Sequence, residues 1–174
     1  MLESAPSPHA FLDALAPADA YQAVFSCCGA RRFAALMLEQ RPFGSAARLL
    51  ACARAAYSAL AREDLLEAFS AHPVIGEDPE ALRAKFAGTA AWSSAEQAGV
   101  GGAPAELLAE LAAQNRAYRE RFGFIFIICA SGKSASDMLS ALNSRLGNAE
   151  ECELAIAAAE QEKIMLLRLE KLGR

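Results

Sequence analysis

Residues 44–60 read Gly-Ser-Ala-Ala-Arg-Leu-Leu-Ala-Cys-Ala-Arg-Ala-Ala-Tyr-Ser-Ala-Leu, and this stretch carries the clearest helical pattern of the chain. Its apolar side chains recur every three or four residues, at Ala46, Leu49, Leu50, Ala53, Tyr57 and Leu60. That spacing places all of them on one face of a helix. The pattern therefore predicts an amphipathic helix that begins after Gly44 and Ser45 and packs one side into a core.

The C-terminal part of the chain carries a second, longer helical pattern. Asn148 is a suitable capping residue. Three acidic side chains follow it, where the helix dipole favours negative charge: Glu150, Glu151 and Glu153. The apolar stripe beyond them is interrupted only by Gln161 and consists of Leu154, Ala158, Met165, Leu169 and Leu172. We expect this helix to run from about residue 149 to about residue 171.

Shorter helical patterns fill most of the remaining chain, with Pro42 and Pro73 at two of the breaks between them. The expected helices cover residues 17–28, 30–40, 63–70, 79–87, 104–122 and 134–146, with a helical turn after Ser93. Only residues 124–129, Phe-Ile-Phe-Ile-Ile-Cys, have the composition of a strand, and no second segment is available to pair with them. We predict an all-α fold, a single compact domain of roughly eight or nine helices over residues 1–174, with 124–129 as a buried extended or irregular segment.

The composition excludes several classes of protein. Of the 174 residues, 54% are hydrophobic and 22% are charged, which is typical of a folded globular domain and not of a disordered chain. The formal net charge is −4, so the chain offers no general electrostatic attraction to nucleic acid. A small molecule or another protein is therefore the expected partner.

The cysteines and histidines indicate a reducing compartment and no metal site. The five cysteines include the adjacent pair Cys27 and Cys28 and show no C-x-x-C spacing, so neither a disulfide framework nor a thiolate metal site is indicated. His9 and His72 lack the spacing of metal ligands. The N-terminus has no secretory pattern, and the most apolar stretch, residues 122–130, is too short to cross a bilayer. We expect a soluble, cytoplasmic protein that does not bind membranes.

His72 is the first candidate for chemistry. Pro73 keeps it out of the α region just where the helix over residues 63–70 must end, so its ring lies at a helix C-terminus. A histidine side chain has an ordinary pKa of about 6.5, and the negative end of a helix dipole favours its charged form, which suits an acid or base. The alternative is that His72 only caps the last helix carbonyls, and the residues alone leave the two interpretations even.

Two further motifs have a structural interpretation beside the functional one. Ser93 and Glu96 have the spacing of a capping box, which explains both residues without a ligand but does not explain Gln97. Asn115 lies on the inward stripe of the helix over residues 104–122, so its amide needs hydrogen-bond partners from the protein or from a ligand. A satisfied structural network is the more common outcome.

Two apparent motifs carry little weight. Gly132-Lys133-Ser134 lacks the earlier glycine of a phosphate-binding loop and favours a helix start instead. Cys129 is the best-placed nucleophile among the thiols, but thiolate catalysis needs a base, and a free cysteine is more often a small buried apolar residue.

Several motifs occur in the chain in a fixed order. They are His72-Pro73-Val74-Ile75-Gly76, Ser93-x-x-Glu96-Gln97, Asn115-x-x-Tyr118-x-x-x-Phe122-Gly123-Phe124-x-Phe126, Arg145-Leu146-x-Asn148 with Glu153, and Glu160 to Lys163-Ile164. Together they resemble the 2-oxo-4-hydroxy-4-carboxy-5-ureidoimidazoline (OHCU) decarboxylase family, from Arg41-Pro42-Phe43 to the last helix. The resemblance implies an all-helical, commonly dimeric enzyme without a cofactor, which converts the small molecule OHCU to (S)-allantoin and CO2 in the degradation of uric acid.

The resemblance also implies roles for individual residues. His72 would be the catalytic acid or base, and Glu96 its partner. The substrate pocket would be lined by Pro73, Ser93, Gln97, Phe124, Ile127 and Ile128. Arg145 lies in a matching motif and would contact a carboxylate or the ureido group.

Two other classes of function stay open. A catalytically silent helical interaction module would use the His72-Pro73 and Ser93-x-x-Glu96 features only as caps. A cysteine-dependent hydrolase would lose its activity on thiol alkylation. An active decarboxylase instead requires His72, Glu96 and Gln97 to converge on one concave site.

Overall fold

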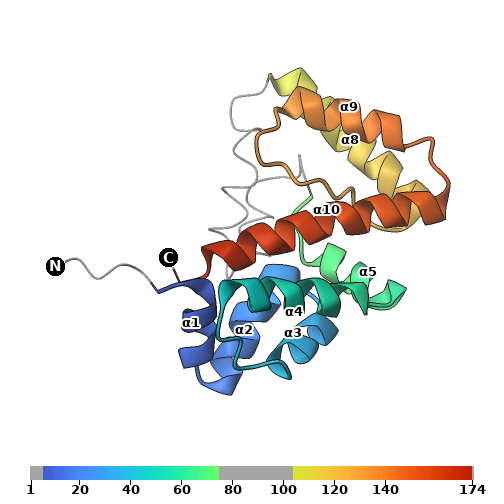
Figure 1. The fold of residues 1–174 in the computed structure, drawn as a ribbon. Helices are drawn as coiled ribbons and strands as arrows, with labels where there is room; N and C mark the ends of the chain where they lie inside the picture. Colours follow the sequence, from blue (N-terminus) through green and yellow to red (C-terminus); the bar gives the residue numbers. More distant parts are fainter. Residues whose placement is uncertain (1–5, 75–103, 174) are drawn as a thin grey trace. The chain divides into compact units, whose positions relative to one another are not determined.

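The computed structural model describes residues 6–74 and 104–173 (Figure 1). Every regular element in these residues is an α-helix, so the all-α prediction is confirmed for the described part of the chain. The helix expected over residues 79–87 and the turn expected after Ser93 lie outside the described residues. The described helices are α1 (Pro8–Ala14), α2 (Pro17–Cys28), α3 (Arg31–Leu38), α4 (Ala46–Ser58), α5 (Arg62–Ser70), α8 (Ala105–Phe122), α9 (Ala135–Arg145) and α10 (Glu150–Lys171).

The helix ends follow the signals in the sequence. Ser45 caps α4, because its hydroxyl oxygen accepts the backbone N–H of Arg48 at 3.2 Å. Ser134 and Asp137 form a reciprocal capping box at the start of α9. Gly123 ends α8 with a φ of 75°, in the left-handed region that glycine adopts without strain. The one described helix that the sequence pattern did not predict is α1, whose seven residues bury only Leu12.

The described helices belong to two compact units. The first comprises Met1–Ala68 with Glu162–Arg174, and the second comprises Phe69–Gln161. In the first unit α2 packs on α3, and α3 packs on α4 (Figure 1). Fully buried side chains of this unit include Leu12, Val24, Phe33, Met37 and Leu169. The inward face predicted for α4 is confirmed at Leu49, Ala53 and Tyr57, which are buried. Of the other residues assigned to this face, Leu50 and Leu60 are half-buried and Ala46 is exposed.

In the first unit, a carboxylate on α1 fastens the loop that precedes α4. Asp13 accepts the backbone N–H groups of Phe43 and Gly44, each at 2.9 Å. Arg41 in turn donates from Nη2 to the carbonyl oxygens of Asp13 at 3.1 Å and of Leu15 at 2.7 Å. Burial raises the pKa of Asp13, but the two N–H groups and the nearby charge of Arg41 outweigh it, so this pKa lies below its usual value. The ionised carboxylate therefore stabilises the folded loop.

The second unit is built around aromatic side chains. Its helices α8 and α9 pack on each other (Figure 1). The ring of Tyr118 on α8 lies 4.7 Å from that of Phe122 and 5.3 Å from that of Phe126, measured between centroids. Residues 124–129 form neither helix nor strand, and the buried side chains among them are Phe124, Phe126, Ile127, Ile128 and Cys129. The prediction of a buried irregular segment is confirmed, and residues 124–129 are called the irregular segment below.

The helix α10 has 22 residues, and its bounds confirm the prediction of a helix from about residue 149 to residue 171. Its buried side includes Gln161, Met165 and Leu169, as the apolar stripe indicated. Glu153 lies in the first turn of the helix, as predicted, and its side chain is fully buried. No helix within residues 6–74 and 104–173 is both long enough and apolar enough to span a bilayer.

Candidate active site

His72 lies two residues beyond the end of α5 and is only 5% exposed. Its backbone N–H donates to the carbonyl oxygen of Phe69 at 3.0 Å, which closes a turn at the helix end. The half-buried Pro73 follows directly. The helix therefore ends where the histidine-proline pair predicted, and the imidazole is enclosed by protein and not spread on the surface.

The other residues expected around His72 divide into two groups. Ser93, Glu96 and Gln97 lie outside the described residues, so their predicted convergence on His72 stays a prediction. The expected wall residues are described, and Phe124, Ile127 and Ile128 are 5%, 3% and 7% exposed.

Phe69 links His72 to the irregular segment within the second unit. Its ring centroid lies 5.4 Å from that of Phe124, and its carbonyl oxygen accepts the backbone N–H of His72. The end of α5 and the start of the irregular segment are therefore joined by direct packing. The expected acid or base and the expected apolar wall belong to one continuous body.

Arg145, in the last turn of α9, is 8% exposed and occupied by protein acceptors. Its Nε donates to Oε1 of Glu153 at 2.8 Å, and its Nη2 forms an ion pair with the same oxygen at 2.5 Å. Its Nη1 donates to the carbonyl oxygen of Ile127 at 2.9 Å. The guanidinium carbon lies 4.6 Å from the ring centroid of Phe126, in cation–π contact. The structure thus places Arg145 inside the protein, against the irregular segment.

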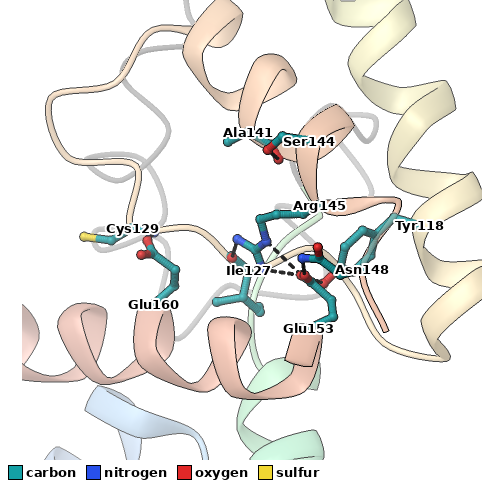
Figure 2. A network of polar contacts seen from close by, with 9 residues as sticks. All are labelled: Tyr118, Ile127, Cys129, Ala141, Ser144, Arg145, Asn148, Glu153 and Glu160. Atoms are coloured by element: carbon teal, nitrogen blue, oxygen red, sulfur yellow. Dashed lines mark hydrogen bonds and ion pairs between the residues drawn. The ribbon is translucent and has the colours of Figure 1, made fainter. Parts of the chain in front are cut away.

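Glu153 is the centre of this network (Figure 2). Besides Arg145, its Oε1 accepts the hydroxyl of Tyr118, and its Oε2 accepts the side-chain amide of Asn148 at 2.8 Å. A fully buried carboxylate is costly unless it is paired and hydrogen-bonded, and here three side chains meet that requirement. The family-like motif contained Glu153, but its spacing gave no sign of this pairing.

Tyr118 serves as a hydrogen-bond donor and not as an acid. Burial raises the pKa of its phenol, and the hydrogen bond to Glu153 and the charge of Glu153 raise it further, while Arg145 lowers it. The phenol therefore stays protonated at neutral pH. A signal for this contact existed in the sequence, since a tyrosine on the buried face of α8 needs a partner for its hydroxyl.

A second carboxylate of α10 holds the far end of the irregular segment. Oε2 of Glu160 accepts the backbone N–H of Cys129 at 2.8 Å. Lys133 donates from Nζ to the carbonyl oxygen of Cys129, also at 2.8 Å. Cys129 itself is a free, buried thiol, which fits its structural interpretation. Within the described ranges, no group of three or more His, Cys, Asp or Glu side chains gathers that could hold a metal ion.

The comparisons with known proteins identify the family. A model of the OHCU decarboxylase family matches residues 13–170 of the chain. The chain belongs to the OHCU decarboxylase family. It is 33% identical over 129 residues to the 2-oxo-4-hydroxy-4-carboxy-5-ureidoimidazoline decarboxylase of Haloferax volcanii, a match that covers 74% of this chain and 73% of that protein. A crystal structure of OHCU decarboxylase in the presence of (S)-allantoin matches the fold with a TM-score of 0.71 at 40% identity, covering 85% of this chain and 94% of that one.

One OHCU decarboxylase relative is much longer than this chain. The uric acid degradation bifunctional protein TTL of Arabidopsis thaliana is 41% identical over 147 residues. That match covers 84% of this chain but only 45% of the Arabidopsis protein. The chain thus spans less than half of this bifunctional relative.

Proposed function

We propose that the chain is a cofactor-independent carboxy-lyase that converts OHCU to (S)-allantoin and CO2 in uric acid degradation. The family match over residues 13–170 carries this proposal. The likeness to a decarboxylase crystallised in the presence of (S)-allantoin supports it, as does the buried position of His72 at the end of α5.

The substrate supplies its own electron sink. Its carboxylate-bearing carbon is bonded to the ring carbon of a C=N group, so the electron pair of the breaking C–C bond moves toward that group as CO2 leaves, and the ring nitrogen of that group takes up a proton. The resulting enol-like intermediate is then protonated on one face of the ureido-bearing carbon, while the hydroxyl loses its proton to give the ring carbonyl. The protein must orient the substrate and place protons, which are tasks for side chains alone.

We assign individual roles from the family resemblance. His72 accepts the proton of the substrate hydroxyl, and Glu96 holds the imidazole in place. Ser93, Gln97 and Pro73 hold the substrate. The irregular segment, through Phe124, Ile127 and Ile128, excludes water and so favours loss of the carboxylate charge.

We also propose that residues 1–174 act as one catalytic domain, as a homodimer in the cytoplasm. The family match extends across both compact units. The odd number of cysteines and the lack of a C-x-x-C spacing support a reducing compartment. Light scattering at assay concentration tests the dimer, since a monomeric mass in the active protein contradicts it.

The decisive experiment compares His72→Ala with His9→Ala, the other histidine of the chain. OHCU decays unaided to racemic allantoin, so the readout is the enantiomeric excess of allantoin together with the rate of CO2 release. We expect the wild type and His9→Ala to form (S)-allantoin, and both His72→Ala and Glu96→Ala to give slow, nearly racemic product. A folded His72→Ala protein with full activity contradicts the mechanism, and an inactive wild type favours the helical interaction module.

A further inference from the structure

We infer that Arg145, Glu153 and Glu160 are positioning residues that fix the backbone on both sides of Ile128, and so hold the substrate-facing wall in shape. This inference rests on the proposed function, because the irregular segment is a substrate wall only in the proposed decarboxylase. It assigns Arg145 a role toward the protein backbone in place of a contact with the substrate.

The first anchor holds the carbonyl of Ile127. Arg145 Nη1 donates to this oxygen at 2.9 Å, while Nε and Nη2 of the same guanidinium lie 2.8 and 2.5 Å from Oε1 of Glu153 (Figure 2). A guanidinium is planar and presents its donors in a fixed fork. Glu153 on one edge therefore sets the direction in which Nη1 meets Ile127.

The second anchor holds the N–H of Cys129. Oε2 of Glu160 accepts this N–H at 2.8 Å. The two anchored groups, the carbonyl of Ile127 and the N–H of Cys129, flank Ile128 on its two sides. Each is a backbone group that a regular ladder would otherwise satisfy.

Both anchors depend on one helix. Glu153 and Glu160 lie seven residues apart on α10, which is close to two full turns, so they occupy the same face of the helix. Both also belong to the second unit, Phe69–Gln161, together with the irregular segment. The register of α10 thus fixes the irregular segment at two points.

The proposed chemistry needs such fixing. A displacement of a positioning group by about 1 Å can cost about a hundredfold in rate. Ile127 and Ile128 are 3% and 7% exposed, but apolar packing alone is not directional and does not set the rotation of a backbone. The charged anchors supply the missing direction.

The bonding of Arg145 disfavours a direct substrate contact. Its Nε and Nη1 donate to protein acceptors, its Nη2 lies in the ion pair with Glu153 without a hydrogen bond of its own, and Phe126 covers its plane. A substrate carboxylate would have to compete with the fully buried carboxylate of Glu153. The positioning role requires no such exchange.

The test uses Glu160→Leu and Glu160→Gln, with Glu162→Leu on the same helix as the matched control. Glutamine keeps an oxygen that accepts the N–H of Cys129, whereas leucine removes it. We expect Glu160→Leu to lower kcat by about tenfold or more with a smaller change in KM, and to lower the enantiomeric excess of (S)-allantoin. Glu160→Gln should retain most of the activity, and amide hydrogen exchange at Cys129 should accelerate only in the leucine variant.

A folded Glu160→Leu protein with the wild-type kcat and enantiomeric excess overturns the inference. A Glu160→Gln protein as impaired as Glu160→Leu also overturns it. Arg145→Lys adds an independent arm, because lysine keeps the charge but loses the fork, and its kcat should fall while KM changes little. A dominant rise in KM there indicates a substrate contact and also overturns it. If the wild type forms no (S)-allantoin, the proposed function fails, and the exchange rate at Cys129 still decides whether Glu160 anchors the segment.

Discussion

Tyr118 and Glu153 are 35 residues apart in the chain and share a hydrogen bond in the interior of the second unit. The phenol comes from α8 and the carboxylate from the first turn of α10, and both side chains are fully buried. The bond gives the buried hydroxyl of Tyr118 an acceptor, and it helps to offset the cost of burying the charge of Glu153. It joins the aromatic packing to the ionic network that holds the irregular segment.

Tyr118→Phe should lower the free energy of unfolding by about 1.5–3 kcal/mol, the usual contribution of a hydrogen bond to a charged group. Urea denaturation at pH 7 measures this loss in the free energy of unfolding, and Tyr21→Phe in the first unit is the control. Because the folded pKa of Tyr118 is raised, its contribution is complete below pH about 10, the pKa of an unfolded tyrosine, and declines as the pH rises above it. A difference between wild type and Tyr118→Phe that grows above pH 10 contradicts this.

The Arg145–Glu153 pair should show strong coupling. Arg145→Met leaves a buried carboxylate uncompensated and should cost about 3–5 kcal/mol, and Glu153→Met should cost a similar amount. The double variant should be far more stable than the sum of these losses implies, because neither charge is left alone. A double-mutant cycle by chemical denaturation measures the coupling, and strictly additive losses would show that the pair does not interact.

Asp13→Asn should destabilise the first unit by about 1 kcal/mol at pH 7, through weaker bonds to Phe43 and Gly44. The folded pKa of Asp13 is lowered, so its contribution is complete above the unfolded pKa of about 3.9 and is lost as the pH falls through the folded pKa. The stability curves of wild type and Asp13→Asn should therefore converge below pH 4. Stability curves that stay parallel down to pH 2 would show that the ionised carboxylate of Asp13 is not the source of the difference. Glu39→Gln serves as the control at an exposed site.

The thiols should differ in reactivity. Burial raises the pKa of Cys27 to about 12, so this residue holds almost no thiolate at pH 8, whereas Cys152 is exposed. Iodoacetamide should modify Cys152 first and leave Cys27 intact in the native protein, as peptide mass spectrometry can follow. Retained decarboxylation after this labelling is expected, and its loss would revive the cysteine-dependent hydrolase.

The capping box of α9 should be worth about 1 kcal/mol in Ser134→Ala, with Ser136→Ala on the exposed face as the matched control. Thermal unfolding of the two variants measures the difference. Equal melting temperatures would show that Asp137 alone suffices to start the helix.

The spacing of apolar residues predicted the helices that pack one apolar face into the core. The helices α4 and α10 begin and end within a few residues of their predicted bounds, because capping signals and stripes are local. The short helix α1 escaped prediction, since a single buried side chain, Leu12, sets no period.

The contacts of the buried polar side chains could not be predicted from the spacing of residues. Glu153 fits the first turn of a helix whether it faces water or protein, and only its partners from α8 and α9 decide between the two. Arg145 was likewise expected to face a substrate, because its backbone acceptor at Ile127 is a contact that no side-chain pattern encodes. His72 was placed correctly beyond α5 because the proline after it acts locally.

The glycine that ends α8 separates two buried aromatic residues, Phe122 and Phe124, and a methyl group added to it would meet no atom within 4 Å. The constraint at Gly123 is therefore one of chirality and not of volume. An L-alanine there should cost about 1–2 kcal/mol, whereas its mirror image, a D-alanine introduced by chemical ligation, should be accepted and should even stiffen the unfolded chain.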